Sequence, residues 1–201
     1  AKYVYDNRLT DKTEITLETL SGIKHIKMYI ENGKVTGATV DMGAPILDPK
    51  NIPVNLKGKM VLNRKIEVKG KECEITCVSM GNPHCVVFVE DVETVRIEKI
   101  GPLFEHHPLF PDRTNTEFIQ LSSGKSLKMR VWERGAGETL ACGTGACAAT
   151  VASILNGYCH KDEDIKVVLL GGILYIRWDS ETDHVFMTGP AATICTGEYD
   201  L

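Results

Sequence analysis

A cysteine next to two closely spaced glycines is the feature of this sequence with the clearest chemical potential. Cys142 comes directly before Gly143-Thr144-Gly145, and residues 143–156 contain no charged side chain. We expect this apolar run to be a helix that begins just after Cys142. The first N–H groups of a helix lack partners and the helix dipole is positive there, so this end stabilises anions. The position therefore predicts a lowered pKa for the Cys142 thiol and a cradle for a substrate carboxylate.

Two charged residues come shortly before this cysteine. Glu133 and Arg134 follow a stretch, 127–132, in which apolar and polar residues alternate as they do in a strand. A strand would hold both side chains on a rigid element close to Cys142. Taken alone, Cys142 could be a buried structural cysteine, and Arg134 could form an ordinary surface ion pair. The combination of acid, arginine, thiol and glycines favours a site.

A second group of polar residues surrounds His84. Asn82-Pro83 is a turn signal directly before it, and an apolar stretch follows. Asn82 and Asn115 are both compatible with plain turn positions. A histidine in such a turn can be structural, or it can take part in acid–base chemistry near neutral pH.

Together these motifs resemble the diaminopimelate epimerase family of cofactor-independent, two-cysteine amino-acid racemases and epimerases. Glu133-Arg134-Gly135 with residues 141–146 is similar to the family's second catalytic motif. Residues 80–85 resemble its middle motif and residues 113–115 the one that follows. The joint occurrence of these motifs is specific, and the resemblance extends over the whole length of the chain.

The resemblance implies a role for each matched residue. Cys142 matches one of two thiols that exchange a proton with the α-carbon, and Glu133 matches the residue that tunes it. His84 matches the residue that tunes the other thiol, which we expect in a segment before Ala1. The matches on the substrate side are Asn82, Asn115, Glu133 and Arg134, with Gly143 and Thr144 as backbone donors to the reacting carboxylate.

The implied activity is the interconversion of LL- and meso-2,6-diaminopimelate, in the biosynthesis of lysine and of the peptidoglycan precursor, with no cofactor. A thiol and a thiolate on opposite faces of the α-carbon can each act as acid or base, depending on the direction. Because one thiol is expected outside these residues, we expect the 201-residue chain alone to be inactive.

The sequence is compatible with three other functions. The first is an acyl-transfer enzyme with Cys142 as nucleophile and His84 as base. The second is a binding lobe without catalysis. The third is another racemase of the same fold, such as a proline racemase, against which Glu133-Arg134 argues because it suits a substrate with a second charged end.

The rest of the chain predicts an α+β fold, in which short strands joined by hairpins form a barrel-like sheet around the buried helix. Strands are expected at 14–20, 23–30, 35–42, 65–68, 73–78, 85–89, 116–121, 127–132, 165–170, 173–178, 184–187 and 192–196. An amphipathic helix is expected at 92–100, broken by Pro102. Asn156-Gly157 should end the central helix.

The resemblance implies two pseudo-symmetric lobes. Residues 1–42 and 188–201 would be the remainder of an N-terminal lobe, and residues 43–187 the C-terminal lobe that carries Cys142. The start at Ala1, inside what reads as a helix, indicates a fragment or a processed product.

The composition limits the classes of partner and the compartment. The net charge is −4 and there is no basic run, which argues against nucleic acid or an anionic membrane. Seven cysteines without regular spacing favour reduced thiols in the cytoplasm. Adjacent His106 and His107 lack a third ligand, so we expect no metal. The expected partner is a small amino-acid substrate, and a homodimer is a hypothesis for the assembly.

Overall fold

The structure, a computed structural model, describes residues 1–19 and 22–198, which fall into two compact units. The smaller unit holds residues 1–41 and the C-terminal residues from 188 on, and the larger unit holds residues 42–187. That these units are the remainder of an N-terminal lobe and a C-terminal lobe stays a prediction.

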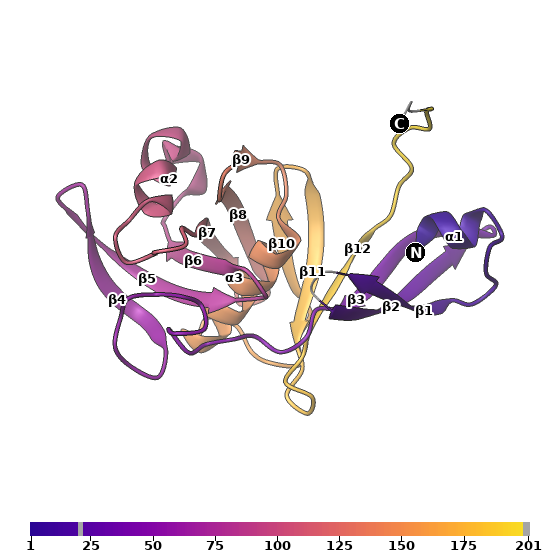
Figure 1. Cartoon of the computed structure of the whole chain (residues 1–201), viewed down its shortest axis with the longest axis horizontal. Coiled ribbons are helices and arrows are strands. Elements are labelled where there is room, and N and C mark those ends of the chain that lie inside the picture. Colours follow the sequence, from indigo (N-terminus) through magenta and orange to yellow (C-terminus); the bar gives the residue numbers. More distant parts are fainter. Residues whose placement is uncertain (20–21, 199–201) are drawn as a thin grey trace. The chain divides into compact units, whose positions relative to one another are not determined.

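The smaller unit is a helix packed on a three-stranded meander (Figure 1). Its elements are α1 (Lys2–Asp6), β1 (Glu14–Thr19), β2 (Gly22–Glu31) and β3 (Lys34–Asp41), with antiparallel pairing of β1–β2 and β2–β3. The β2–β3 turn uses Asn32 and Gly33 at φ 51° and 73°, as the Asn-Gly signal predicts. Leu20 and Ser21, the predicted end of the first strand and its turn, lie outside the described residues.

The larger unit is a curled sheet. Its strands are β4 (Val61–Val68), β5 (Lys71–Ser79), β6 (Pro83–Phe88), β7 (Asn115–Ser123), β8 (Ser126–Glu133), β9 (Gly137–Thr139), β10 (Ile165–Leu169), β11 (Gly172–Trp178) and β12 (Val185–Pro190), the last of which continues into the smaller unit. The hydrogen-bonded order is β12-β11-β10-β8-β7-β6-β5-β4, and β9 pairs with β8. The pairs β6–β7 and β8–β10 are parallel, whereas β4–β5, β5–β6, β7–β8 and β10–β11 are antiparallel.

The helix α3 (Gly143–Leu155) lies in the concave side of this sheet and contacts β5, β6, β7, β10 and β11 (Figure 1). Residues 145–153 are all buried, as an all-round apolar helix requires. Asn156 is the C-cap and Gly157 follows with φ 77°. The prediction of a buried central helix closed by Asn-Gly is confirmed.

A second apolar core on the larger unit is covered by α2 (Ile97–Glu105), which is preceded by the 3₁₀ turn η1 (Val92–Thr94). The predicted helix at 92–100 is therefore placed too early, and the prediction that Pro102 breaks it is wrong. The reason is packing, because Ile97, Gly101 and Phe104 are buried on the side of α2 that meets β7 and β8.

The strand predicted at 192–196 is also wrong, since residues 191–198 have no regular secondary structure. Ile194, in the middle of this segment, is 96% exposed, so no apolar packing supports a strand here. The short strand β9 was not predicted, because three residues carry too little periodicity.

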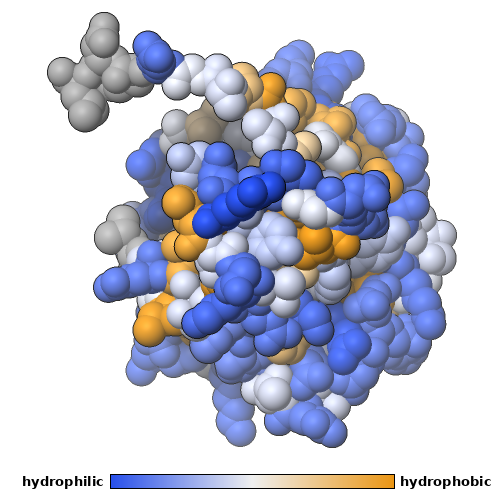
Figure 2. All heavy atoms as spheres, turned by 90° about the vertical axis from the view of Figure 1, so that its right-hand side faces the viewer, coloured by the Kyte–Doolittle hydropathy of each residue, from blue (hydrophilic) through white to orange (hydrophobic). Residues whose placement is uncertain are grey.

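In the described part of the chain, no helix is long and apolar enough to span a membrane. The face drawn in Figure 2 is mainly hydrophilic, with apolar residues in small groups, as is usual on a protein surface.

Candidate active site at the N-terminus of α3

Cys142 is the N-cap residue of α3. Its backbone is extended, with φ −134° and ψ 110°, so that the chain turns into the helix directly after it. The sulfur accepts a hydrogen bond from the Gly145 N–H at 3.3 Å and lies 3.5 Å from the Thr144 hydroxyl oxygen. The side chain is almost enclosed, with 7% of the residue exposed. The sequence thus placed this thiol correctly at the anion-stabilising end of a helix.

The predicted direction of the Cys142 pKa is wrong for this structure. Burial, together with the negative charges of Glu117 and Glu133, raises the pKa of the Cys142 thiol to about 12. The hydrogen bonds from Thr144 and Gly145 lower the pKa but do not outweigh burial. The helix end acts as expected, but desolvation of a thiolate costs more than one or two hydrogen bonds return.

A line of hydrogen bonds connects Cys142 to His84. The Asn82 amide nitrogen donates to the Thr144 hydroxyl at 3.2 Å, and the Asn82 amide oxygen lies 3.0 Å from Nε2 of His84. Thr144 in turn contacts the sulfur. Four residues from two separate motifs, Asn82 and His84 from the first and Cys142 and Thr144 from the second, therefore form one cluster in the larger unit.

His84 is held from its other side by Glu117, a residue that the sequence analysis did not single out. Nδ1 of His84 lies 2.7 Å from Oε1 of Glu117, and both side chains are fully buried on the neighbouring strands β6 and β7. Oε2 of Glu117 has no hydrogen-bond partner in the structure. The sequence did contain a signal for Glu117, because it is the one charged residue in the β7 segment, and a buried charge needs a partner.

Asn115 and Arg134 are joined to each other through the backbone. The Asn115 amide nitrogen donates to the Pro83 carbonyl at 2.8 Å, and its amide oxygen accepts from the Arg134 backbone N–H at 2.9 Å. The guanidinium of Arg134 is exposed and donates to the Asp112 carbonyl at 2.9 Å. Asn115 thus ties the start of β6 to the turn that follows β8.

Glu133 ends β8 next to this turn. Its carboxylate accepts a hydrogen bond from the Thr139 hydroxyl on the paired strand β9. Glu133 acts on Cys142 through its charge, which contributes to the raised pKa of that thiol. The predicted pair therefore interacts electrostatically in this structure.

The turn after β8 is braced from α2 by Glu105, which sequence reasoning also missed. Oε2 of Glu105 accepts from the Trp132 indole N–H at 2.7 Å, and Oε1 accepts from the Gly135 N–H at 2.9 Å and from Arg113 at 3.1 Å. Burial acts to raise the pKa of Glu105, but these bonds and the charges of His106 and Arg113 outweigh it and lower the pKa. Glu105 fixes the backbone that carries Glu133 and Arg134.

The other cysteines lie away from this cluster or inside the cores. Cys77 and Cys85 belong to the core beneath α2, and Cys147 is buried within α3. Cys195 is exposed and belongs to the smaller unit. Among the residues that the structure describes, no group of three or more His, Cys, Asp or Glu side chains is arranged to hold a metal ion.

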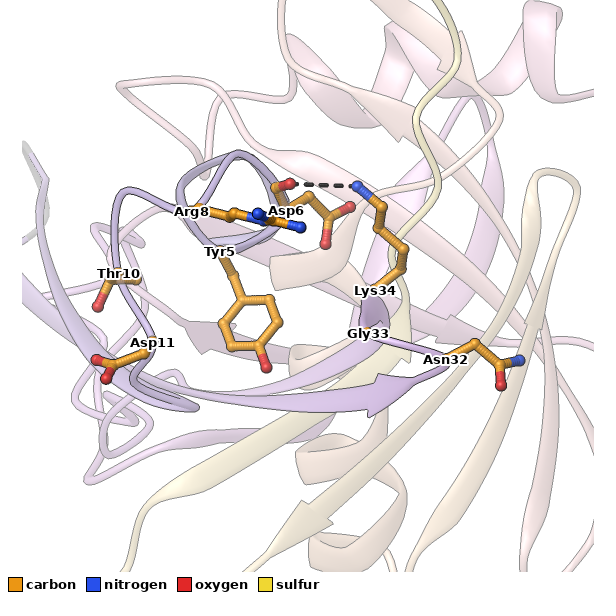
Figure 3. A pocket seen from close by; sticks show the side chains of 8 residues that line it. All are labelled: Tyr5, Asp6, Arg8, Thr10, Asp11, Asn32, Gly33 and Lys34. Carbon is orange, nitrogen blue, oxygen red and sulfur yellow. Dashed lines mark hydrogen bonds between the residues drawn. The ribbon is translucent and has the colours of Figure 1, made fainter.

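A polar hollow of about 750 Å³ lies within the smaller unit (Figure 3). It is lined by Tyr5, Asp6, Arg8, Thr10, Asp11, Asn32, Gly33 and Lys34. Lys34 donates to the Asp6 carbonyl at 3.2 Å across one side of it. None of the predicted site residues contributes to this hollow.

Comparison with known proteins identifies the family of the chain. The profile of the family described as "Diaminopimelate epimerase" matches residues 76–194. A diaminopimelate epimerase from Acetivibrio thermocellus is 54% identical over 200 residues, which cover all of this chain and 71% of that protein. One from Methanococcus maripaludis is 52% identical over 200 residues, which cover 72% of it.

The fold has relatives among solved structures. A probable proline racemase from Agrobacterium radiobacter superposes with a TM-score of 0.73 at 15% identity, over all of this chain and 65% of that one. At this identity the likeness concerns the fold alone, and it confirms the predicted α+β architecture of a sheet around a central helix. The sequence identities settle the family more closely: the chain belongs to the diaminopimelate epimerase family.

Proposed function

We propose that this chain carries one half of the active site of a diaminopimelate epimerase, which interconverts the LL and meso stereoisomers by proton transfer at the α-carbon. The observation that supports this most directly is the position of Cys142. Its sulfur lies at the N-terminus of α3, and a backbone N–H and a hydroxyl contact it. The relatives that bear this name cover the whole chain at more than half identity.

The helix end would bind the reacting carboxylate. The N–H groups of Gly143 and Thr144 are in the first turn of α3, where helical partners are missing. When the α-proton leaves, negative charge spreads onto this carboxylate, and fixed donors stabilise the charge most where it builds up. The same groups would therefore bind the substrate and lower the barrier.

Cys142 would donate its proton in one direction and accept one in the other. Its raised pKa means that it rests as a thiol, ready to act as the acid. The hydrogen bonds from Gly145 and Thr144 stabilise the thiolate that this donation leaves behind. The base on the opposite face would be the second thiol that the family resemblance implies.

Arg134, Asn115, Glu133 and Asn82 would hold the distal amino-acid end of the substrate. The exposed planar guanidinium of Arg134 suits a carboxylate with two parallel hydrogen bonds. Asn115 keeps a spare amide proton and a spare lone pair beyond its two structural bonds. We further propose that the enzyme is cytoplasmic, uses no cofactor and takes a small amino acid as its partner.

The acyl-transfer alternative is not favoured by the geometry. Both ring nitrogens of His84 are engaged, Nδ1 by Glu117 and Nε2 by Asn82. A general base must be within hydrogen-bond reach of the nucleophile, and here two side chains intervene between the ring and the sulfur.

The test is exchange of the substrate α-hydrogen in D₂O, catalysed by the protein as its gene encodes it and followed by mass spectrometry from both stereoisomers. Cys142→Ala should slow exchange by about 10²–10⁴-fold, the usual contribution of a positioned acid or base. Cys195→Ser, which alters an exposed thiol in the other unit, is the matched control and should leave exchange unchanged. Undiminished exchange by Cys142→Ala in both directions would contradict the proposal.

The 201-residue chain on its own should show no turnover, because the opposite-face thiol is expected elsewhere. Turnover by this chain would contradict the expectation that a thiol outside these residues is required.

A further inference from the structure

The hydrogen bonds between Glu117 and Cys142 form one unbroken line through four contacts. From Glu117 they pass to His84 at 2.7 Å, to Asn82 at 3.0 Å, to Thr144 at 3.2 Å and to the sulfur at 3.5 Å. All five side chains belong to the larger unit. The predicted substrate role of Thr144 concerns its backbone, and it leaves the hydroxyl and Glu117 without a function.

The donors and acceptors give this line a direction. The Asn82 amide nitrogen donates to Thr144, so the one proton of the Thr144 hydroxyl is free to point at the sulfur. The Asn82 amide oxygen then faces His84, which must supply a proton on Nε2. From His84 to Cys142, each residue therefore donates a hydrogen bond to the next one: His84 to Asn82, Asn82 to Thr144, and Thr144 to the sulfur.

Glu117 occupies the position that fixes this direction. Its Oε1 accepts the proton of Nδ1 of His84, which sets the ring orientation. Because Nδ1 then carries a proton, Nε2 donates to Asn82 in the form of the ring that holds a proton on both nitrogens, and the carboxylate stabilises that form. A Cβ at Gly145 would lie 2.7 Å from Oε1 and 3.1 Å from the sulfur, so the carboxylate and the thiol both lie next to Gly145 in the first turn of α3. The unpartnered Oε2 makes this a costly place for a carboxylate whose only role is structural.

We propose that Glu117 is a positioning residue for Cys142, which it reaches through His84, Asn82 and the Thr144 hydroxyl, and that this hydroxyl is the donor that holds and stabilises the sulfur as a thiolate.

Two carboxylates act on the sulfur through their charge, Glu117 on β7 and Glu133 on β8. His84 on β6 is connected to the sulfur through Asn82 and Thr144. The strands β5, β10 and β11 contribute apolar residues to the core around α3, among them Val78, Val167 and Ile176. The two carboxylates raise the pKa of the thiol and so oppose thiolate formation, whereas the hydrogen bond from the Thr144 hydroxyl lowers that pKa.

The last link is tested by the rate at which iodoacetamide alkylates Cys142 at a fixed pH near 8, measured by mass spectrometry of the Cys142 peptide. Thr144→Val removes the donor and should slow alkylation about ten-fold, because a hydrogen bond to a charged group is worth about one pKa unit. Thr144→Ser keeps the hydroxyl and should retain the wild-type rate. Cys195 in the same sample is the internal control. A faster or unchanged rate in Thr144→Val would overturn the link, since mere loosening of the site exposes the thiol and speeds the reaction.

The role of Glu117 is tested by a double-mutant cycle on the same rate. Glu117→Gln removes a charge, which acts on the sulfur through space equally in both backgrounds. The part of the effect of Glu117→Gln on the alkylation rate that is transmitted through the Thr144 hydroxyl must be absent in the Thr144→Val background. We expect the effects of Glu117→Gln in the two backgrounds to differ by at least about two-fold, the lower end for residues in one hydrogen-bond network. Equal effects would overturn the role.

Thermal unfolding of each variant checks that it folds, and if Glu117→Gln does not fold, His84→Gln interrupts the line one step later in the same cycle. The inference rests on the proposed function only in taking Cys142 as the reacting thiol. Alkylation needs no substrate, so these outcomes are independent of whether the protein acts on diaminopimelate.

Discussion

Glu105 and Glu117 are two buried acids of the larger unit with opposite surroundings. Glu105 accepts three hydrogen bonds on its two oxygens, from Trp132, Gly135 and Arg113. Glu117 has its one bond to His84, and its second oxygen has no partner. A fully bonded buried acid stabilises the structure around it, whereas an acid left short of partners costs stability. The difference indicates that Glu105 stabilises the turn after β8, which makes it a brace, whereas Glu117 is a positioning residue for the thiol.

The sharpest test of the brace is Glu105→Gln. One amide NH₂ must then face a former donor, either the Trp132 N–H or the Gly135 N–H, and leave it unbonded. We expect the free energy of unfolding to fall by about 3 kcal/mol, the scale for losing a bond to a charged group with a donor left unsatisfied. Urea denaturation measures it. A loss below about 1 kcal/mol would mean that Glu105 is not a brace.

The packing around Trp132 gives the next largest effect. A Cβ at Gly101 of α2 would lie 2.4 Å from the Trp132 ring, which Glu105 holds by its indole N–H. Gly101→Ala gains helix propensity of up to about 1 kcal/mol, but overpacking costs about 1–3 kcal/mol. We expect a net loss of about 1–2 kcal/mol in urea denaturation. If Trp132 is free to move, the variant should instead be more stable than the wild type.

The sequence predicted the scaffold better than the acids within it. An all-round apolar run and Asn-Gly turns are local signals, and they placed α3 and the β2–β3 hairpin correctly. The helix through Pro102 and the missing strand around Ile194 depend on what packs against each segment, which no local pattern contains. For the same reason the sequence placed Cys142 at a helix end but gave the wrong direction for its pKa, because burial comes from the whole fold.

The thiol region should show its own dependence of stability on pH. The folded pKa of Cys142, about 12, lies above the unfolded value of about 8.5. Its contribution to stability is therefore complete below about pH 8.5 and is lost as the pH rises from there toward 12. At pH 9.5 the loss should be about 1.4 kcal/mol relative to pH 7.5.

The measurement compares wild type with Cys142→Ala by urea denaturation at both values of pH. Burial also raises the pKa of Cys85 and of Cys159, so the wild-type curve alone contains several thiols. The difference between the two proteins isolates Cys142. If that difference does not change between pH 7.5 and 9.5, the folded thiol is not protected from ionisation.

The smallest effect on stability is expected at Glu117, and it is the other half of the comparison. Glu117→Gln is the same substitution as at Glu105, but here an amide NH₂ can take the place of the unpartnered Oε2 while the amide oxygen keeps the bond to His84. Removing the charge also removes its desolvation cost, so urea denaturation should show a change within about 1 kcal/mol. A loss as large as that of Glu105→Gln would make Glu117 a brace as well. A small change in stability together with altered Cys142 reactivity would instead separate the two acids by function, because a residue that costs the fold little to replace has its effect at the thiol.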